Sequence, residues 1–152
     1  MTFEMEIQGL AAKFRRAIDL AKENGKLNFD DIFCAFPRGC CGDTCYLLGQ
    51  YLLDHGIAST YVCGNYYYDN PEGRWQSHAW IMVNELIVDI TGDQFKFSQD
   101  FIYYNLPVYV GKTDAFHELF EVDKRDIHLL LGLNKVSDFR LNGLYGIITQ
   151  YI

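Results

Sequence analysis

The spacing of hydrophobic residues near the start of the chain is helical. Leu10 and Phe14 are four residues apart, and further apolar residues follow at the same interval. This pattern predicts an amphipathic helix over residues 3–24, because residues spaced three or four apart share one helical face. Arg15 and Arg16 would then lie on the face that meets solvent.

A second helix is predicted over residues 41–55. Leu48 and Leu52 belong to its apolar stripe, and Gly56 gives a natural end because glycine tolerates the left-handed backbone that closes helices. The connector before it, residues 26–39, contains Phe36-Pro37-Arg38-Gly39.

After this helix the hydrophobic period changes to two, the spacing of strands. Strands are expected over residues 58–68, 76–83, 86–91 and 101–110, with a turn at 69–73 and the second and third strands joined at Asn84-Glu85. A short helix is expected over 114–121, and the tail 137–152 fits either a helix or a strand. Helices followed by an antiparallel meander indicate an α+β fold, with N-terminal helices packed on the sheet.

Length and composition indicate one globular domain over residues 1–152. Hydrophobic residues make up 49% of the chain, charged residues 22%, and the net charge is −7. The basic residues form no stripe, so we expect no nucleic-acid partner, and no apolar stretch is long enough for a membrane span. The start of the chain lacks the features of a secretory signal, which favours the cytoplasm with reduced cysteines, or leaderless export as an effector.

The cysteines do not have metal-ligand spacing. The chain has five, and none forms a C-x-x-C pair; His55, His117 and His128 show no ligand spacing either. We therefore predict no metal and no cofactor. Cys34, Cys45 and Cys63 are interpreted as inert packing residues.

The beginning of the second helix suits a reactive thiol. Cys40 and Cys41 lie there between Gly39 and Gly42. Unpaired backbone amides at a helix start stabilise a thiolate and can bind the oxyanion of a tetrahedral intermediate. Chemistry alone does not separate Cys40 from Cys41 as the nucleophile.

A histidine and an aspartate are predicted to lie on one face of the following hairpin. If Asn84-Glu85 is a two-residue loop, Val83 faces Leu86, and His78 and Asp89 point to the same side as diagonal neighbours. A carboxylate in that place can orient the imidazole and stabilise its cation, as in a catalytic triad. Asp89 in an apolar strand needs a partner, and an arginine or a backbone amide is the alternative to a histidine.

These segments resemble the transglutaminase-like, papain-related superfamily of cysteine enzymes. The segment 41–64 looks like the family's nucleophile helix and the strand after it, and His78-Ala79-Trp80 and Asp89-Ile90-Thr91 are similar to its His-Ala-Trp and Asp-Pro-Thr motifs. Ile90 departs from the usual proline. The resemblance covers about residues 37–91 and also has features of arylamine N-acetyltransferases and lasso-peptide leader peptidases.

The resemblance implies a transglutaminase-like core and a Cys41, His78, Asp89 triad, since the distance to Gly56 fits Cys41 rather than Cys40. It implies a thiol hydrolase of a peptide or protein amide, as peptidase or deamidase. The alternatives are an acyltransferase, a toxin-like effector and a non-catalytic binding relative. Tyr66, Tyr67, Tyr68, Trp75 and Trp80 line either a cleft or the packed strands.

Overall fold

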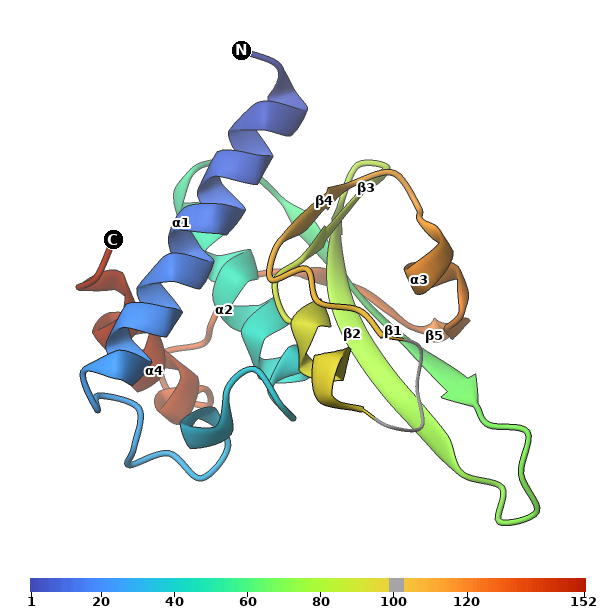
Figure 1. Cartoon of the computed structure of the whole chain (residues 1–152). Helices are drawn as coiled ribbons and strands as arrows, with labels where there is room; N and C mark the ends of the chain where they lie inside the picture. The colour runs from blue at the N-terminus through green and yellow to red at the C-terminus, as the bar shows by residue number, and fades with distance from the viewer. Residues whose placement is uncertain (99–102) are drawn as a thin grey trace.

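The computed structural model describes residues 1–98 and 103–152, which form an antiparallel sheet with most of its helices on one face (Figure 1). The α-helices are α1 (Phe3–Glu23), α2 (Cys41–Asp54), α3 (Ala115–Glu118) and α4 (Phe139–Thr149). The strands are β1 (Ser59–Tyr67), β2 (Trp75–Val83), β3 (Leu86–Asp89), β4 (Tyr109–Gly111) and β5 (Glu121–Leu130). The fold also contains two short 3-10 helices, η1 (Phe33–Ala35) and η2 (Gly92–Phe97). The α+β class predicted from the sequence is confirmed.

The first two helices fall close to their predicted limits, and their starts differ in how they are capped. Thr2 caps α1 by accepting a hydrogen bond from the Met5 N–H. Cys40 is the residue before α2, and its side chain makes no capping hydrogen bond. The amides that begin α2 therefore have no side-chain acceptor from Cys40.

The sheet has the strand order β4-β3-β2-β1-β5. The hairpin of β2 and β3 has the predicted register, with Val83 opposite Leu86 and a two-residue loop in which Asn84 has a positive φ of 54°. β3 ends at Asp89, two residues earlier than predicted, so the start of β2 extends beyond it.

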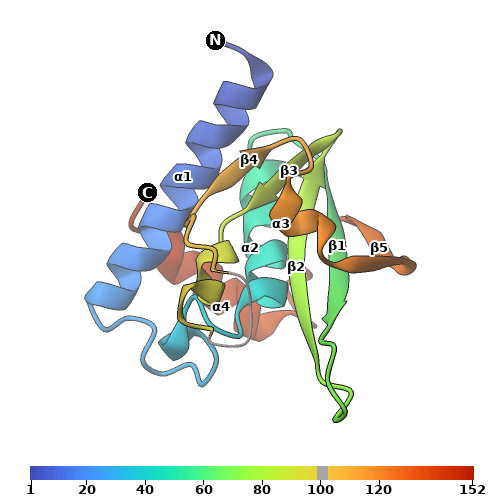
Figure 2. The same ribbon diagram turned by 45° about the vertical axis from the view of Figure 1, so that its right-hand side comes forward.

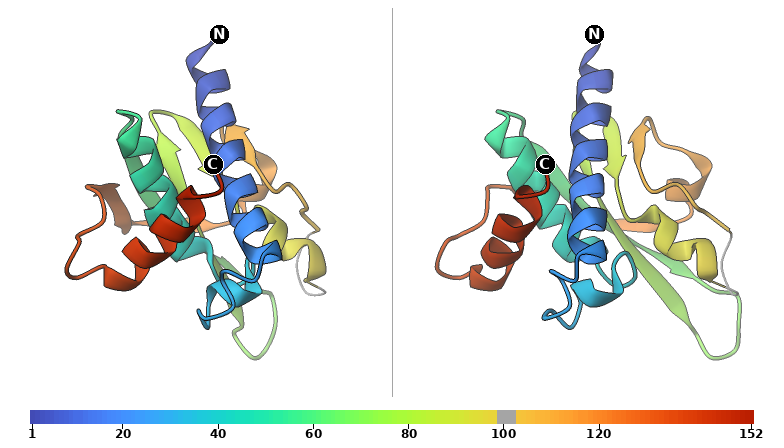
Figure 3. Two further views of the ribbon diagram at one scale, coloured as in Figure 1. Left: turned by 90° about the vertical axis from the view of Figure 1, so that its left-hand side faces the viewer. Right: turned by 60° about the vertical axis from the view of Figure 1, so that its left-hand side comes forward.

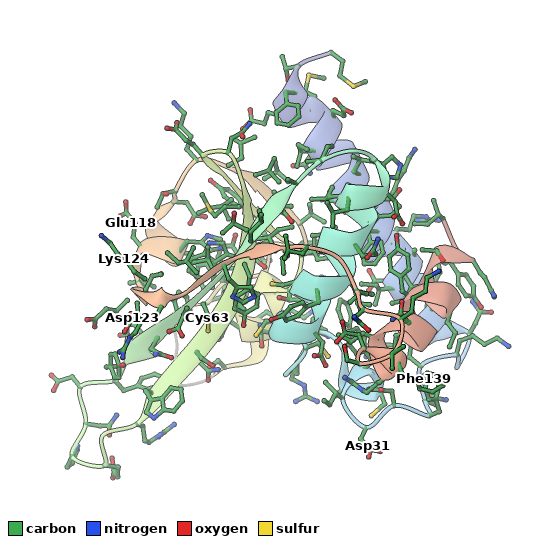
Figure 4. The ribbon with its side chains drawn as sticks, turned by 180° about the vertical axis from the view of Figure 1, so that it is seen from behind. Asp31, Cys63, Glu118, Asp123, Lys124 and Phe139 are labelled. Carbon is green, nitrogen blue, oxygen red and sulfur yellow. The ribbon has the colours of Figure 1, made fainter. Side chains whose placement is uncertain are left out.

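The remaining predictions for the second half of the chain are partly wrong. Of the strand expected over residues 101–110, the structure forms only the part that belongs to β4. Residues 101 and 102 of that prediction lie outside the described residues. β5 was not predicted; it pairs with β1 at the opposite end of the sheet, so the strands are not a simple meander. Asp123 and Lys124 of β5 project outward from this edge (Figure 4). The tail forms α4.

The two faces of the sheet carry different cores. α1, α2 and α4 gather on one side (Figures 1 and 3), where they pack against Ala79, Ile81 and Val88. α3 lies on the other side (Figure 2), where an aromatic cluster is built from Trp80, Phe95, Phe116 and Phe120 with neighbours. Among the described residues, no helix has the length and apolar character that crossing a membrane requires.

Arg15 differs from its prediction. Its side chain is buried rather than solvated, because η2 covers this part of α1. Both terminal nitrogens donate to Asp93 at 2.8 Å, and one also donates to the Ile90 carbonyl at 2.9 Å. The pair therefore fixes η2 against α1.

Candidate active site

Cys41 is the first residue of α2 and is partly buried. Burial disfavours the thiolate, but a hydrogen bond from His78, the charge of that imidazole and the Ala79 N–H outweigh it and lower the pKa of Cys41. The Ala79 amide lies on the part of β2 that extends past β3. The early end of β3 thus leaves room for the sulfur beside this strand.

Cys40, the alternative nucleophile, has the opposite environment. Its thiol is fully buried and donates to the carbonyls of Ile32 and Arg38, both at 3.3 Å. Burial, with the nearby negative charge of Asp43, raises the pKa of Cys40 to about 12. Cys40 is therefore a protonated thiol at neutral pH and a poor nucleophile.

His78 and Asp89 are in contact, as the hairpin geometry predicted. Nε2 of His78 lies 2.7 Å from Oδ2 of Asp89, and both side chains are buried. Burial favours the neutral ring, but the charge and hydrogen bond of Asp89, together with Cys41, raise the pKa of His78 to about 9. Burial acts in the opposite direction on Asp89 and by itself would raise the pKa of this carboxyl. The two histidines in contact with Asp89, His78 and His117, outweigh burial and hold that pKa well below its ordinary value.

These contacts decide which nitrogen of His78 faces the thiol. A carboxylate only accepts hydrogen bonds, so Nε2 carries the hydrogen that points to Asp89. Nδ1 remains for Cys41. The side-chain nitrogen of Gln94 also lies 3.1 Å from Nδ1. A thiol, an imidazole and a carboxylate thus form one chain of hydrogen bonds that starts at the first turn of α2.

Two residues of this site were missed by the sequence analysis. Gln94 lies on η2, and His117 lies on α3 with Nε2 2.7 Å from the same Asp89 oxygen. The sequence held one pattern that could have pointed to His117, the spacing Asp114-x-x-His117. In that spacing a helix-capping aspartate faces an imidazole one turn later.

His78, Asp89 and His117 also offer three possible metal ligands within 4.8 Å of one another. A metal would need a lone pair on each histidine Nε2. Both Nε2 atoms instead lie 2.7 Å from one carboxylate oxygen, the distance of an N–H donor to its acceptor. Hydrogen bonds therefore account for this cluster.

Two adjoining cavities are lined by Gln94, whose side-chain nitrogen lies 3.1 Å from His78 Nδ1. One of about 280 Å³ is lined by Arg38, Gly39, Gln76, Gln94, Phe95 and Ser98. The other, of about 930 Å³, lies between α1, η1 and η2 and shares Arg38 and Gln94 with the first. Among the described residues, the Arg38 side chain is exposed and makes no hydrogen bond or ion pair.

The aromatic residues considered as cleft lining do not meet at this opening. Trp80 is buried in the aromatic cluster. Trp75 and Tyr67 are exposed on the long arm of the β1–β2 hairpin, which projects from the body (Figure 1).

Comparisons of the chain with protein-family models, with curated proteins and with solved structures found no match. The functional conclusion therefore depends on the geometry of the site.

Proposed function

We propose that this chain is a cysteine-nucleophile amide hydrolase with a transglutaminase-like, papain-related core, and that it acts on a peptide or protein. The observation that carries the proposal is the arrangement of Cys41, His78 and Asp89. The thiol lies at a helix start with a lowered pKa, and its imidazole partner is hydrogen-bonded to a buried carboxylate at 2.7 Å. Perturbed pKa values of this kind are typical of activated nucleophiles.

The proposed reaction has two stages. The Cys41 thiolate attacks the amide carbon, and the carbon–nitrogen bond breaks as His78 gives its proton to the leaving amine. Water then adds to the thioester, with His78 accepting a proton from that water, and the carbon–sulfur bond breaks to release the acid and restore the thiol. Asp89 orients His78 throughout and stabilises its cation.

The oxyanion of each tetrahedral intermediate needs two donors. The Cys41 backbone N–H is the first, because a first-turn amide has no partner inside the helix. We assign the second to Gln94. Its side-chain nitrogen lies 3.1 Å from His78 Nδ1, and the same residue lines the two cavities described above. In the thiolate–imidazolium pair Nδ1 carries the proton and cannot accept a hydrogen bond from Gln94, so this amide is free to donate to the substrate oxygen.

Covalent labelling tests the nucleophile. Iodoacetamide at pH 6.5 is expected to label Cys41 faster than the other four cysteines, as measured by peptide mass spectrometry. Cys41→Ala removes this fast labelling, His78→Ala slows it strongly, and Cys40→Ala is the matched control that leaves it unchanged. Fast labelling that persists in Cys41→Ala contradicts the proposal.

Mass spectrometry of a lysate treated with the wild type or with Cys41→Ala identifies the reaction. New peptide termini indicate a peptidase, and a gain of about one dalton at glutamine or asparagine indicates a deamidase. Cross-linked peptides would instead favour acyl transfer.

A Gln94→Ala variant tests the oxyanion donor separately from the nucleophile. Turnover of a substrate identified from the lysate is expected to fall by about 10²–10³-fold in this variant. Alkylation by iodoacetamide, which forms no oxyanion, stays near the wild-type rate.

A further inference from the structure

Asp89 is held between two histidines that come from opposite directions. Nε2 of His78 on β2 and Nε2 of His117 on α3 each lie 2.7 Å from its Oδ2 atom, and the Thr91 N–H donates to Oδ1 at 3.0 Å. The side chains of all three titratable groups are at most 1% exposed. A triad requires only one of these histidines, so the second calls for a separate explanation.

The far side of His117 faces another carboxylate. Its Nδ1 lies 2.6 Å from Oδ1 of Asp114, and this oxygen also accepts the His117 backbone N–H at 2.9 Å as the cap of α3. Carboxylates accept and do not donate, so a ring placed between two of them donates from both nitrogens. An imidazole that donates from both nitrogens is the imidazolium cation.

We infer that His117, held as a cation by Asp114, is a positioning residue that fixes Asp89 and shares its negative charge with His78. This inference rests on the proposed function, in which His78 must first take and then release a proton. The groups alternate in charge along the row Asp114, His117, Asp89, His78 and Cys41 when the thiolate has formed. Each charge in the row therefore has an opposite neighbour, which offsets the cost of its burial.

Charge sharing matters because of the step that follows attack. A carboxylate that interacted with His78 alone would hold the imidazolium proton more tightly and make it a weaker acid toward the leaving amine. The pKa of His78 is already raised to about 9, and a further rise would make the imidazolium a still weaker acid toward the leaving amine. The His117 cation, which contacts the same Asp89 oxygen, limits how far the pKa of His78 rises.

Within the described part of the chain, few other titratable groups act on this pair. Beyond Asp89 and Cys41, the nearest ring to His78 that titrates is His117, at 6.2 Å between centroids. Besides Asp89 and Asp114, His117 meets the rings of Tyr109 at 5.5 Å and Tyr104 at 6.2 Å. Burial raises the pKa of both tyrosines, so they stay neutral in the pH range of interest.

The first test is His117→Gln, which keeps an amide donor near Asp89 and removes the positive charge. Without that charge, Asp89 acts fully on His78, so the titration midpoint of His78 moves to higher pH, on the order of one unit. Histidine-labelled NMR measures this directly, since the chain has only four histidines to assign. A purely structural role for His117 predicts an unmoved midpoint in the folded variant.

The second test uses Asp114→Asn, a change at the less buried end of the row. In the wild type, the His117 ring is expected to show two N–H resonances at neutral pH. In Asp114→Asn one of them disappears, and the His78 midpoint shifts in the same direction by a smaller amount. A single ring N–H resonance in the wild type overturns the inference, as does an unchanged His78 titration in folded His117→Gln.

These NMR results do not depend on turnover. If Cys41 proves unreactive while both histidine results appear as expected, the proposed function fails and the coupling of the two histidines stands. If Cys41 is reactive and the histidine results are absent, the inference about His117 fails alone.

Discussion

Arg15 and Asp93 form a buried ion pair across 78 residues of sequence, with two nitrogen–oxygen distances of 2.8 Å. Arg15→Met keeps much of the apolar stem but leaves the Asp93 carboxylate buried without its partner. We expect the free energy of unfolding to fall by about 3–5 kcal/mol, as is typical when one partner of a buried pair is removed.

Urea denaturation followed by circular dichroism measures the change. Arg16→Met is the matched control, because Arg16 is the next residue on α1 and is exposed. Its effect is expected to stay within about 0.5 kcal/mol. Equal effects of the two substitutions would contradict a structural role for the ion pair.

The pH dependence of turnover should be bell-shaped. The pKa of Cys41 is lowered and that of His78 is raised to about 9, so the thiolate and imidazolium coexist between those two values. Activity rises as pH increases through the Cys41 pKa, and falls near pH 9 as His78 loses the proton that the leaving amine needs. The rate of Cys41 alkylation against pH reports the lower limit separately. A single alkylation step at or above the ordinary thiol pKa of about 8.5 would contradict the ion pair.

Asp89→Asn should reduce activity while preserving the volume of the side chain. Without the carboxylate, the pKa of His78 falls, so less of the thiolate–imidazolium pair exists near neutral pH. Turnover is expected to fall by about 10²–10⁴-fold. Alkylation of Cys41 at pH 6.5 should slow as well, and recover at pH 10, where the thiol ionises without help. An unchanged alkylation rate at pH 6.5 would show that Asp89 does not act on the thiol.

Arg38 should favour anionic reagents at the thiol. It lines both cavities and has no partner among the described residues. A unit charge about 4 Å away contributes ~1 kcal/mol in water, which is ~5-fold in rate. We therefore expect Arg38→Gln to lower the ratio of iodoacetate to iodoacetamide alkylation of Cys41 by about that factor.

The same ratio in Arg16→Gln, which lines neither cavity, should match the wild type. The effect of Arg38 should also fade in 1 M salt, where the screening length is about 3 Å. A ratio that is insensitive to Arg38 at low salt would exclude this residue from the approach to the thiol.

The sequence predicted the site best where the argument was local. His78 and Asp89 were placed on one face because side chains alternate along a strand and the two-residue loop fixes the register. The start of α2 was predicted correctly for a similar reason, since helical spacing and a glycine-flanked cysteine pair occur in one short segment.

Residues that depend on distant segments were missed. Helical spacing places Arg15 on a polar face but does not reveal that Asp93 and Pro107 cover that face. β5 was missed because its polar residues face solvent at a sheet edge and give no alternating pattern. His117 reaches Asp89 across 28 residues, and no local pattern reports such a contact.

The early end of β3 has a consequence for when the thiol becomes reactive. The Ala79 amide, the His78 ring and the first turn of α2 meet at Cys41 only after the β2–β3 hairpin has docked on that helix. In an unfolded or partly synthesised chain, Cys41 is an ordinary thiol with a pKa of about 8.5. Completion of the fold itself would therefore switch on the nucleophile, and a chain still being made would pose little hazard to its neighbours.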